Sequence, residues 1–187
     1  SITGSDQVWN PRYTKGDPIF MLSFLPSETK RISYASSFGT NQITDSLYNQ
    51  YNTLLSKYSH ISVREANGVK LLKNKFGLSS QITLDPTLLL SAQDWNRQIP
   101  KERLIKEKYI FCYFLNYTFD AFPYVEDLAF DLQKKTGLKL IFGGRPPKSI
   151  KRLKGKYKVG IGPLDFIRLI RDAELVLTTS FHGTAFA

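Results

Sequence analysis

Residues 109–144 read YIFCYFLNYTFDAFPYVEDLAFDLQKKTGLKLIFGG, and this stretch decides the fold class. Residues 109–115 form an apolar, aromatic-rich run, which predicts a buried strand. Residues 120–135 carry apolar side chains at helical spacing and are followed by Gly137, so we expect a helix that ends at a glycine cap. The next apolar run, residues 138–142, predicts another strand. A strand, a helix and a strand at this spacing form the unit from which parallel sheets are built.

The same alternation continues on both sides of this stretch. We expect the remaining strands at residues 1–3, 20–25, 31–35, 60–64, 81–84 and 174–178. We expect the remaining helices at residues 44–58, 65–76 and 163–172, with one more beginning near His182. Residues 91–108 are polar and charged and contain Pro100, which is typical of a linker. The sequence therefore predicts an α/β protein in two parts: residues 1–95, a linker over residues 96–107, and residues 108–187.

The chain carries a net charge of +10, from 26 Lys and Arg against 16 Asp and Glu. Such a charge suits an anionic substrate, a nucleic acid or a solvated basic surface. The densest basic run contains one aromatic residue, Tyr157, and matches no nucleic-acid motif. Its basic residues are Lys148, Lys151, Arg152, Lys154, Lys156 and Lys158. We therefore expect an anionic small substrate and a charged surface, and no nucleic acid. Dinucleotide and P-loop glycine motifs are absent, which argues against those two kinds of site.

Cysteine and histidine are scarce, which limits the chemistry available. The one cysteine, Cys112, lies in the apolar run YIFCYF and is read as a buried strand residue. A disulfide within the chain cannot form, and two histidines are too few for a His-rich centre, so we expect no metal site. This cysteine usage indicates a reducing compartment, the cytoplasm. No run of about 18 apolar residues is present, so we expect no membrane span.

Polar residues directly after predicted strands are the first candidates for a site, because ligands of open α/β sheets bind at the carboxyl ends of the strands. Ser5 and Asp6 follow the first predicted strand, as substrate contact and base respectively, or simply as a turn. Arg64 ends another strand, where its planar fork can bind a carboxylate or phosphate. On spacing alone, an ion pair with Glu65 or another surface acid is the favoured reading of Arg64. Arg145, after residues 138–142, is a weaker candidate for anion contact.

The stretch TTSFHGTA, residues 178–185, holds the strongest candidate. Small hydroxylated residues turn the chain after a strand, and His182 stands where a helix starts. Backbone N–H groups at such a turn attract anions, and a histidine there can exchange a proton near neutral pH. The alternative is a histidine that caps the helix or packs in the core. We expect substrate contacts from Thr179, Ser180, Gly183 and Thr184.

Five stretches, in this order, resemble the polysaccharide pyruvyl transferase family. They are GSDQVWNP at 4–11, YASSFG at 34–39, ISVRE at 61–65, LDPTLLL at 84–90 and DAELVLTTSFHGTAFA at 172–187. The resemblance implies two Rossmann-like halves with mostly parallel sheets that face each other across a cleft, as in the GT-B glycosyltransferases. It also implies a further strand–helix unit before Ser1 and more helix and sheet after Ala187. We therefore expect both halves to be truncated, and activity to need the full-length protein.

The resemblance implies transfer of a pyruvyl group from phosphoenolpyruvate to a sugar of a cell-surface or exopolysaccharide precursor, which forms a ketal. Arg64 and His182 match the family's functional pair. We expect Arg64 to bind the carboxylate or phosphate, His182 to be the general acid, and Asp6 to be the base for an acceptor hydroxyl. Phosphoenolpyruvate is then a substrate, and no separate cofactor is expected. The partners would be this donor and a saccharide acceptor, with peripheral contact to a lipid-linked glycan.

Two other functions fit the same architecture. One is a GT-B-type glycosyltransferase that uses a nucleotide sugar, and the other is a non-catalytic sugar- or anion-binding domain. Analysis of the product distinguishes the first, since the acceptor would gain a hexose instead of a pyruvyl ketal. Calorimetry with both donors and an assay for turnover distinguish the second.

Overall fold

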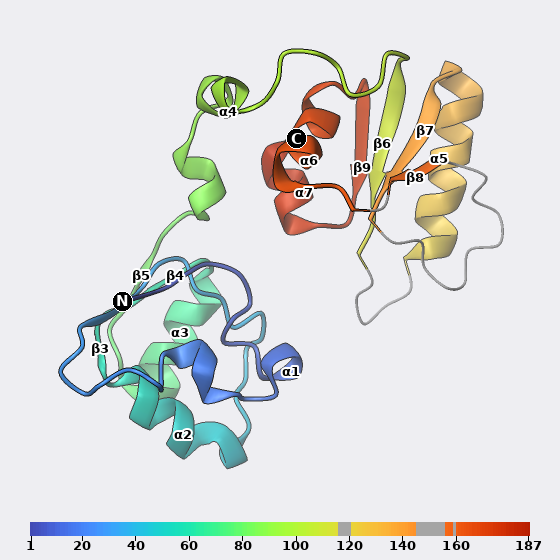
Figure 1. The fold of residues 1–187 in the computed structure, drawn as a ribbon. Coiled ribbons are helices and arrows are strands. Elements are labelled where there is room, and N and C mark those ends of the chain that lie inside the picture. Colours follow the sequence, from blue (N-terminus) through green and yellow to red (C-terminus); the bar gives the residue numbers. More distant parts are fainter. Residues whose placement is uncertain (116–120, 145–155, 159) are drawn as a thin grey trace. The chain divides into compact units, whose positions relative to one another are not determined.

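The computed structural model describes residues 1–115, 121–144, 156–158 and 160–187. The chain divides into two compact units, residues 1–89 and 90–187. Each unit is an α/β structure whose paired strands run parallel (Figure 1). The predicted fold class, α/β with mostly parallel sheets, is confirmed.

The first unit has a three-stranded and a two-stranded parallel sheet, which bridges at Ser36 connect. Together we call them the first sheet, and the carboxyl ends of their strands lie along one edge. These strands are β1 (Ile2–Thr3), β2 (Arg31–Ser33), β3 (Tyr58–His60), β4 (Ser62–Val63) and β5 (Gln81–Ile82). β2 lies between β1 and β3, and β4 pairs with β5. Bridges from Ser36 to Asp6 and to Val63 continue the parallel pairing past the ends of β1 and β2 and connect it to β4. Residues that follow β1, β2, β4 and β5 are therefore brought to the same edge.

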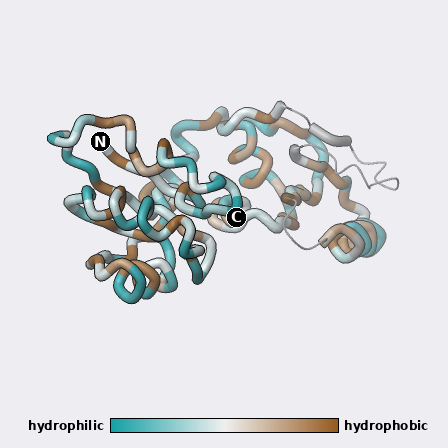
Figure 2. The backbone as a smooth tube through the Cα atoms, turned by 90° about the horizontal axis from the view of Figure 1, so that it is seen from below, coloured by the Kyte–Doolittle hydropathy of each residue, from teal (hydrophilic) through white to brown (hydrophobic). Residues whose placement is uncertain are grey.

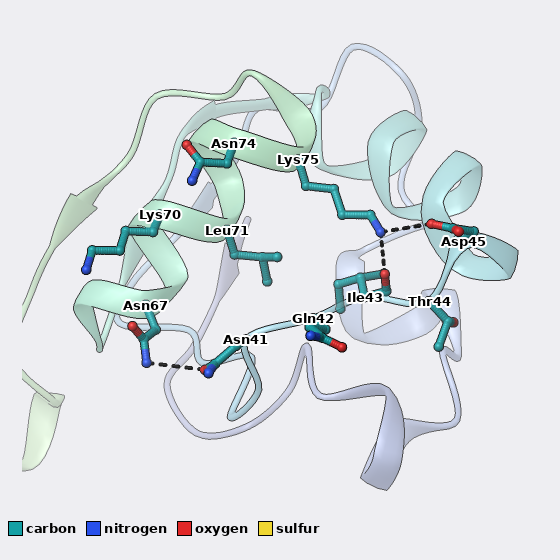
Figure 3. A pocket seen from close by; sticks show the side chains of 10 residues that line it. All are labelled: Asn41, Gln42, Ile43, Thr44, Asp45, Asn67, Lys70, Leu71, Asn74 and Lys75. Atoms are coloured by element: carbon teal, nitrogen blue, oxygen red, sulfur yellow. Dashed lines mark hydrogen bonds and ion pairs between the residues drawn. The ribbon is translucent and has the colours of Figure 1, made fainter.

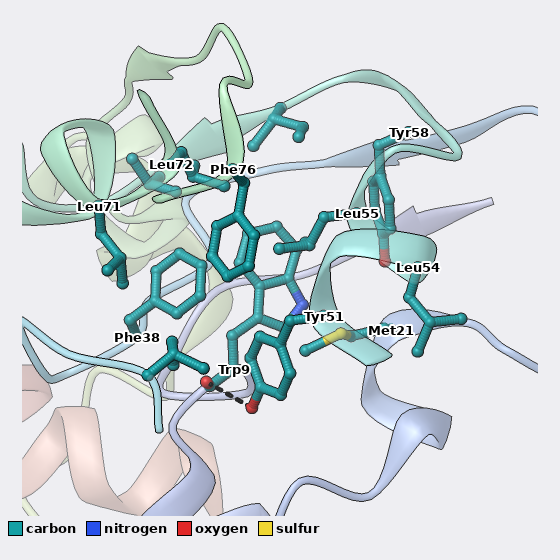
Figure 4. Packing of buried hydrophobic residues seen from close by; sticks show 13 residues of the cluster. Trp9, Met21, Phe38, Tyr51, Leu54, Leu55, Tyr58, Leu71, Leu72 and Phe76 are labelled. Carbon is teal, nitrogen blue, oxygen red and sulfur yellow. Dashed lines mark hydrogen bonds between the residues drawn. The ribbon is translucent and has the colours of Figure 1, made fainter. Parts of the chain in front are cut away.

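Helices of the first unit connect these strands and enclose an aromatic core. They are α1 (Pro11–Thr14), α2 (Asp45–Leu55), α3 (Ala66–Phe76) and the 3-10 turns η1 (Pro18–Met21) and η2 (Pro86–Leu89). Trp9 is completely buried, with its ring 5.3 Å from that of Phe38 and 5.7 Å from that of Tyr58 (Figure 4). The hydroxyl of Tyr51 donates to the Trp9 carbonyl at 3.1 Å. Residues 4–11 thus enter the core immediately after they turn away from β1.

The expected strand at residues 20–25 is wrong. The chain forms η1 there, with Asp17 capping its start by accepting a hydrogen bond from the backbone N–H of Ile19. The buried guanidinium of Arg31 instead forms hydrogen bonds to backbone carbonyls in and just after this segment. It donates to the backbone oxygens of residues 22, 25, 26 and 29. Apolar composition alone suggested a strand, but these carbonyls are satisfied by one side chain instead.

The second unit is built on a four-stranded parallel sheet in the order β8-β7-β6-β9. Its strands are β6 (Tyr109–Tyr113), β7 (Lys139–Gly143), β8 (Lys156–Lys158) and β9 (Leu175–Thr178). Its helices are α4 (Ala92–Gln98), α5 (Phe122–Thr136), α6 (Pro163–Arg171) and α7 (Phe181–Phe186). The strand–helix–strand unit predicted from residues 109–144 is present as β6, α5 and β7.

Both faces of this sheet are covered, which explains why β6 is apolar at every position. Phe111 packs with Ile141 and with Leu169 of α6 on one face. Cys112 packs with Phe142 and with Ala129 of α5 on the other face. Side chains of a strand alternate between faces, so one continuous apolar run fills two cores. Helices with one buried face show mixed hydrophobic and hydrophilic colours along the tube in Figure 2.

The segment expected to be a linker, residues 96–107, packs within the second unit. α4 begins with a capping box, in which the Ser91 and Asp94 side chains each bond the other's backbone N–H. Ile99 and Ile105 are buried, and Arg171 donates to the Pro100 carbonyl at 2.9 Å. Among the described residues, no helix is long and apolar enough to cross a membrane.

Candidate active site

The carboxyl edge of the first sheet brings four polar side chains together. Ser5 and Asp6 follow β1, Arg64 follows β4, and Asp85 follows β5. β4 and β5 pair in parallel, with Val63 opposite Ile82, so the residues after each strand leave the sheet side by side. The Arg64 and Asp85 side chains meet there as an ion pair, with 3.1 Å between Nη1 and Oδ2.

Asp85 is the buried member of this cluster, with a side chain that is 0% exposed. Its Oδ2 accepts hydrogen bonds from Ser5 Oγ at 2.5 Å and from Arg64 Nη1. Its Oδ1 accepts from Thr87, through the backbone N–H at 3.0 Å and the hydroxyl at 2.9 Å. Burial by itself would raise the pKa of Asp85, but the hydrogen bonds from Ser5, Thr87 and Arg64 outweigh it and hold the pKa well below its usual range. Asp85 is therefore a buried carboxylate in its charged form.

Arg64 connects this buried carboxylate to the surface. Its side chain is 11% exposed, and its Nη2 lies 3.8 Å from Oδ1 of Asp6, whose side chain is 64% exposed. The φ angle of Asp6 is +79°, a left-handed conformation that aspartate tolerates better than most residues. The guanidinium thus has a buried acid on one side and an exposed acid on the other. The edge towards Asp6 is where an anionic ligand could reach it.

Glu65 is not the partner of Arg64, although it is the nearest acid in the sequence. Its Oε1 accepts from Ser37 Oγ at 2.8 Å and from the backbone N–H groups of Phe38 and Gly39 at 3.1 and 3.4 Å. These bonds hold the loop after β2 against the start of α3. Spacing alone favoured an ion pair of Arg64 with Glu65 or another surface acid. Arg64 does pair with an exposed acid, Asp6, but its shorter ion pair is with buried Asp85.

A close contact between Gly39 and Gln7 connects two of the stretches that resemble the family, residues 34–39 and 4–11. Gly39 has a φ of +57°, and a Cβ at this position would collide with the Gln7 side chain. Gln7 in turn accepts a hydrogen bond from Asn10 Nδ2 at 2.6 Å. A glycine is therefore required for residues 34–39 to pass over residues 4–11.

A second cluster of predicted residues forms the turn after β9 in the second unit. The Ser180 hydroxyl caps α7 by accepting from the backbone N–H of Gly183 at 3.1 Å. Thr178 Oγ1 donates to the Tyr113 carbonyl at 2.8 Å and accepts from the N–H of Ser180 at 3.0 Å. His182 follows in the first turn of α7, half-buried, with its ring in edge contact with that of Phe181 at 5.2 Å. The turn is thus a rigid support directly beside the histidine.

Close packing fixes the turn further. A Cβ on Gly183 would collide with Thr178 Oγ1, and that oxygen is already held by two hydrogen bonds. Thr179 Oγ1 accepts from the N–H of Leu115 at 2.8 Å, and Thr184 Oγ1 donates to the Ser180 carbonyl at 3.1 Å. The hydroxyls that we expected to contact substrate therefore also have partners within the second unit, in the turn itself or just after β6.

The predicted site residues fall into two groups. Ser5, Asp6 and Arg64 lie together in the first unit, and each contacts either Asp85 or a residue that does. The second group lies together in the second unit and consists of Thr179, Ser180, His182, Gly183 and Thr184. Arg145 and most of the basic run, residues 148–155, lie outside the described residues.

The sequence reasoning missed Asp85 as a functional residue. The signal was available, because Asp85 follows a predicted strand just as Ser5 and Asp6 do. Asp85 also stands directly before Pro86, a pattern that equally indicates the end of a strand. Its Thr87 clamp and its pairing with Arg64, which precedes it by 21 residues, depend on the parallel register.

A hollow of about 790 Å³ lies elsewhere in the first unit, between residues 41–45 and α3 (Figure 3). It is lined mainly by amide, hydroxyl and lysine side chains over Ile43 and Leu71. The lining residues include none of the predicted site residues. In the part of the chain that the structure describes, no group of three or more His, Cys, Asp or Glu could hold a metal ion.

Comparison with known proteins gives one match. The model of a family described as polysaccharide pyruvyl transferase matches residues 2–187. No curated protein and no solved structure matches the chain.

Proposed function

Because the chain belongs to the polysaccharide pyruvyl transferase family and is a transferase, we propose that it moves a pyruvyl group from phosphoenolpyruvate to a saccharide acceptor. The acceptor in this proposal is a sugar of a cell-surface or exopolysaccharide precursor. The reaction takes place in the cytoplasm, which suits a chain with one cysteine and no internal disulfide. Contact with a lipid-linked glycan would be peripheral.

The observation that carries the proposal is the fixed guanidinium of Arg64 at the carboxyl edge of the first sheet. Phosphoenolpyruvate has a carboxylate and a phosphate, and a planar guanidinium can bind either group through two parallel hydrogen bonds. The net charge of +10 also attracts an anionic ligand of this kind to the protein. We assign Arg64 to the carboxylate or phosphate of the donor.

The reaction needs a proton at C3 of phosphoenolpyruvate, which leaves a cationic centre at C2. Two acceptor hydroxyls then form C–O bonds to C2, and the C2–O bond to phosphate breaks. The two hydroxyl protons balance the one that C3 gains and the one that leaves with phosphate. We assign His182 as the general acid that serves the departing phosphate or carries the proton to C3. We also assign phosphate binding to the turn of residues 178–184, and we assign Asp6 as the base that accepts a proton from an acceptor hydroxyl.

Donor binding tests the assignment of Arg64. Phosphoenolpyruvate should raise the melting temperature of the full-length protein, because a ligand at 100 times its Kd stabilises the folded state by about 2.7 kcal/mol. Arg64→Ala should greatly reduce this shift. Arg97→Ala is the matched control, since Arg97 pairs with Asp94 on an exposed helix face and should keep the shift. A shift of unchanged size in Arg64→Ala would remove Arg64 from donor binding.

A further inference from the structure

Asp85 is far more buried than Asp6, the other acid at this edge. The residue is 1% exposed, whereas Asp6 at the same edge is largely open to solvent. Burying a carboxylate is costly unless hydrogen bonds and an opposite charge compensate it. Here four hydrogen bonds converge on it, from residues that follow β1, β4 and β5. An apolar residue at this position could not accept these hydrogen bonds, so the carboxylate itself holds the surrounding groups in place.

The arrangement fixes the direction of the carboxylate. Thr87 binds Oδ1 twice, through its backbone N–H and its hydroxyl, and so prevents rotation of the group. Oδ2 is thereby aimed at Ser5 and at Nη1 of Arg64. A guanidinium is planar and rigid, so a fixed bond at Nη1 restrains the whole plane. The Nη2 side is left facing Asp6 and the solvent-exposed edge.

We infer that Asp85 is a positioning residue, which holds the guanidinium of Arg64 in the orientation that receives the donor's anionic group. This inference rests on the proposed function, in which Arg64 binds phosphoenolpyruvate. Asp85 itself touches no substrate, because Arg64, Ser5 and Thr87 occupy both of its oxygens. Of these three residues, Arg64 is the one that the proposed function places on the donor, so we expect the effect of Asp85 on binding to pass through Arg64.

A double-mutant cycle on donor binding separates this role from a purely structural one. Kd for phosphoenolpyruvate is measured by calorimetry on the full-length protein, at a temperature where each variant is folded by circular dichroism. Asp85→Asn should raise Kd by about 10- to 100-fold, which is the factor that the loss of a hydrogen bond between charged groups typically carries. In the Arg64→Ala background, Asp85→Asn should change Kd by less than about 2-fold, because coupled residues are non-additive.

Each outcome bears on one claim. Additive effects of Asp85→Asn and Arg64→Ala, or an unchanged Kd in Asp85→Asn, would overturn the positioning role while the proposed function stands. An unchanged Kd in Arg64→Ala would instead overturn the proposed role of Arg64. Asp45→Asn is the matched control, because Asp45 forms an ion pair with Lys75 through a fully exposed carboxylate. It should leave Kd unchanged.

A milder variant keeps the inference testable if Asp85→Asn does not fold. Thr87→Val removes the hydroxyl that donates to Oδ1 but keeps the backbone N–H and the side-chain shape. It should raise Kd several-fold, in the same direction as Asp85→Asn, and again only when Arg64 is present. An equal rise in the Arg64→Ala background would contradict the inference.

Discussion

Arg64 Nη1 lies 3.1 Å from Oδ2 of Asp85, a carboxylate with no solvent exposure. The two residues follow the neighbouring parallel strands β4 and β5, whose register sets Val63 opposite Ile82. Arg64 therefore does not lie free on the surface. It forms a buried pair with Asp85 on one side and faces the exposed carboxylate of Asp6 on the other, which gives the site a cation of fixed direction.

The stability of the first unit should depend on pH through Asp85. The folded-state pKa of Asp85 lies below the usual aspartate value of about 3.9. The ionised carboxylate therefore stabilises the folded state at pH values above about 3.9. The stabilisation is complete at neutral pH and is lost as pH falls below about 4, towards the folded-state pKa. Asp85→Asn should lower the free energy of unfolding by about 1–3 kcal/mol at pH 7.

Urea unfolding in a Trp95→Phe background measures this effect, because Trp9 then reports on the first unit alone. The difference between the parent and Asp85→Asn should be constant from pH 7 to about 5 and shrink below about 4. A difference that grows as the pH falls would show that the ionised carboxylate is not what stabilises the unit.

Strand–helix periodicity predicted most of the fold but none of the pairings at the site. The continuous apolar run of β6 and the glycine-terminated pattern of α5 are local signals, so their elements were found. Residues 20–25 are also apolar, but the Arg31 side chain donates hydrogen bonds to two of their carbonyls, those of Leu22 and Leu25. No local sequence pattern reveals a bond from a residue in a later strand. Periodicity reports local backbone preference, whereas carbonyl partners depend on the tertiary fold.

The candidate site was predicted in part for the same reason. Ser5, Asp6 and Arg64 were found because each directly follows a predicted strand. Asp85 satisfied the same criterion, but its importance comes from burial and from a partner 21 residues away. Spacing alone favoured a surface acid for Arg64, because sequence distance does not reveal which strand lies next to which.

His182→Ala should lower kcat of the full-length enzyme by about 100- to 10,000-fold, which is the usual contribution of a general acid or base. Kd for phosphoenolpyruvate should stay within about 2-fold, since the proposal places proton transfer, not donor binding, on this residue. The matched control is His60→Ala, because His60 is the other histidine and lies exposed on β3. Steady-state kinetics and calorimetry give both quantities. Unchanged kcat in His182→Ala would contradict the assignment.

Gly183→Ala should destabilise the turn that supports His182. The added Cβ would meet Thr178 Oγ1, which cannot move away without breaking bonds to Tyr113 and Ser180. Overpacking of this kind typically costs about 1–3 kcal/mol. The melting temperature and kcat should both fall. Gly162→Ala is the control in the same unit, because a Cβ there meets open space, and it should lower the melting temperature less. Equal losses in the two variants would mean that the turn tolerates the extra carbon.

Cys112 should resist thiol reagents in the folded protein. Burial raises the pKa of the Cys112 thiol to about 12, so at pH 8 the reactive thiolate is rarer than in an unfolded chain by more than about a thousand-fold. Labelling with a thiol-reactive dye should therefore be slow in buffer and fast in urea. Rapid labelling of the native protein would contradict the packing of β6 between α5 and α6.

The central claim is pyruvyl transfer, and mass spectrometry of the acceptor tests it most directly. The full-length protein is incubated with ¹³C-labelled phosphoenolpyruvate, a mixture of nucleotide sugars and the saccharide precursors of the source cell. The account predicts a product that carries one ¹³C-pyruvyl ketal per phosphate released, and its loss in His182→Ala. A product that instead gains a hexose, or labelled donor that is never consumed, would contradict it.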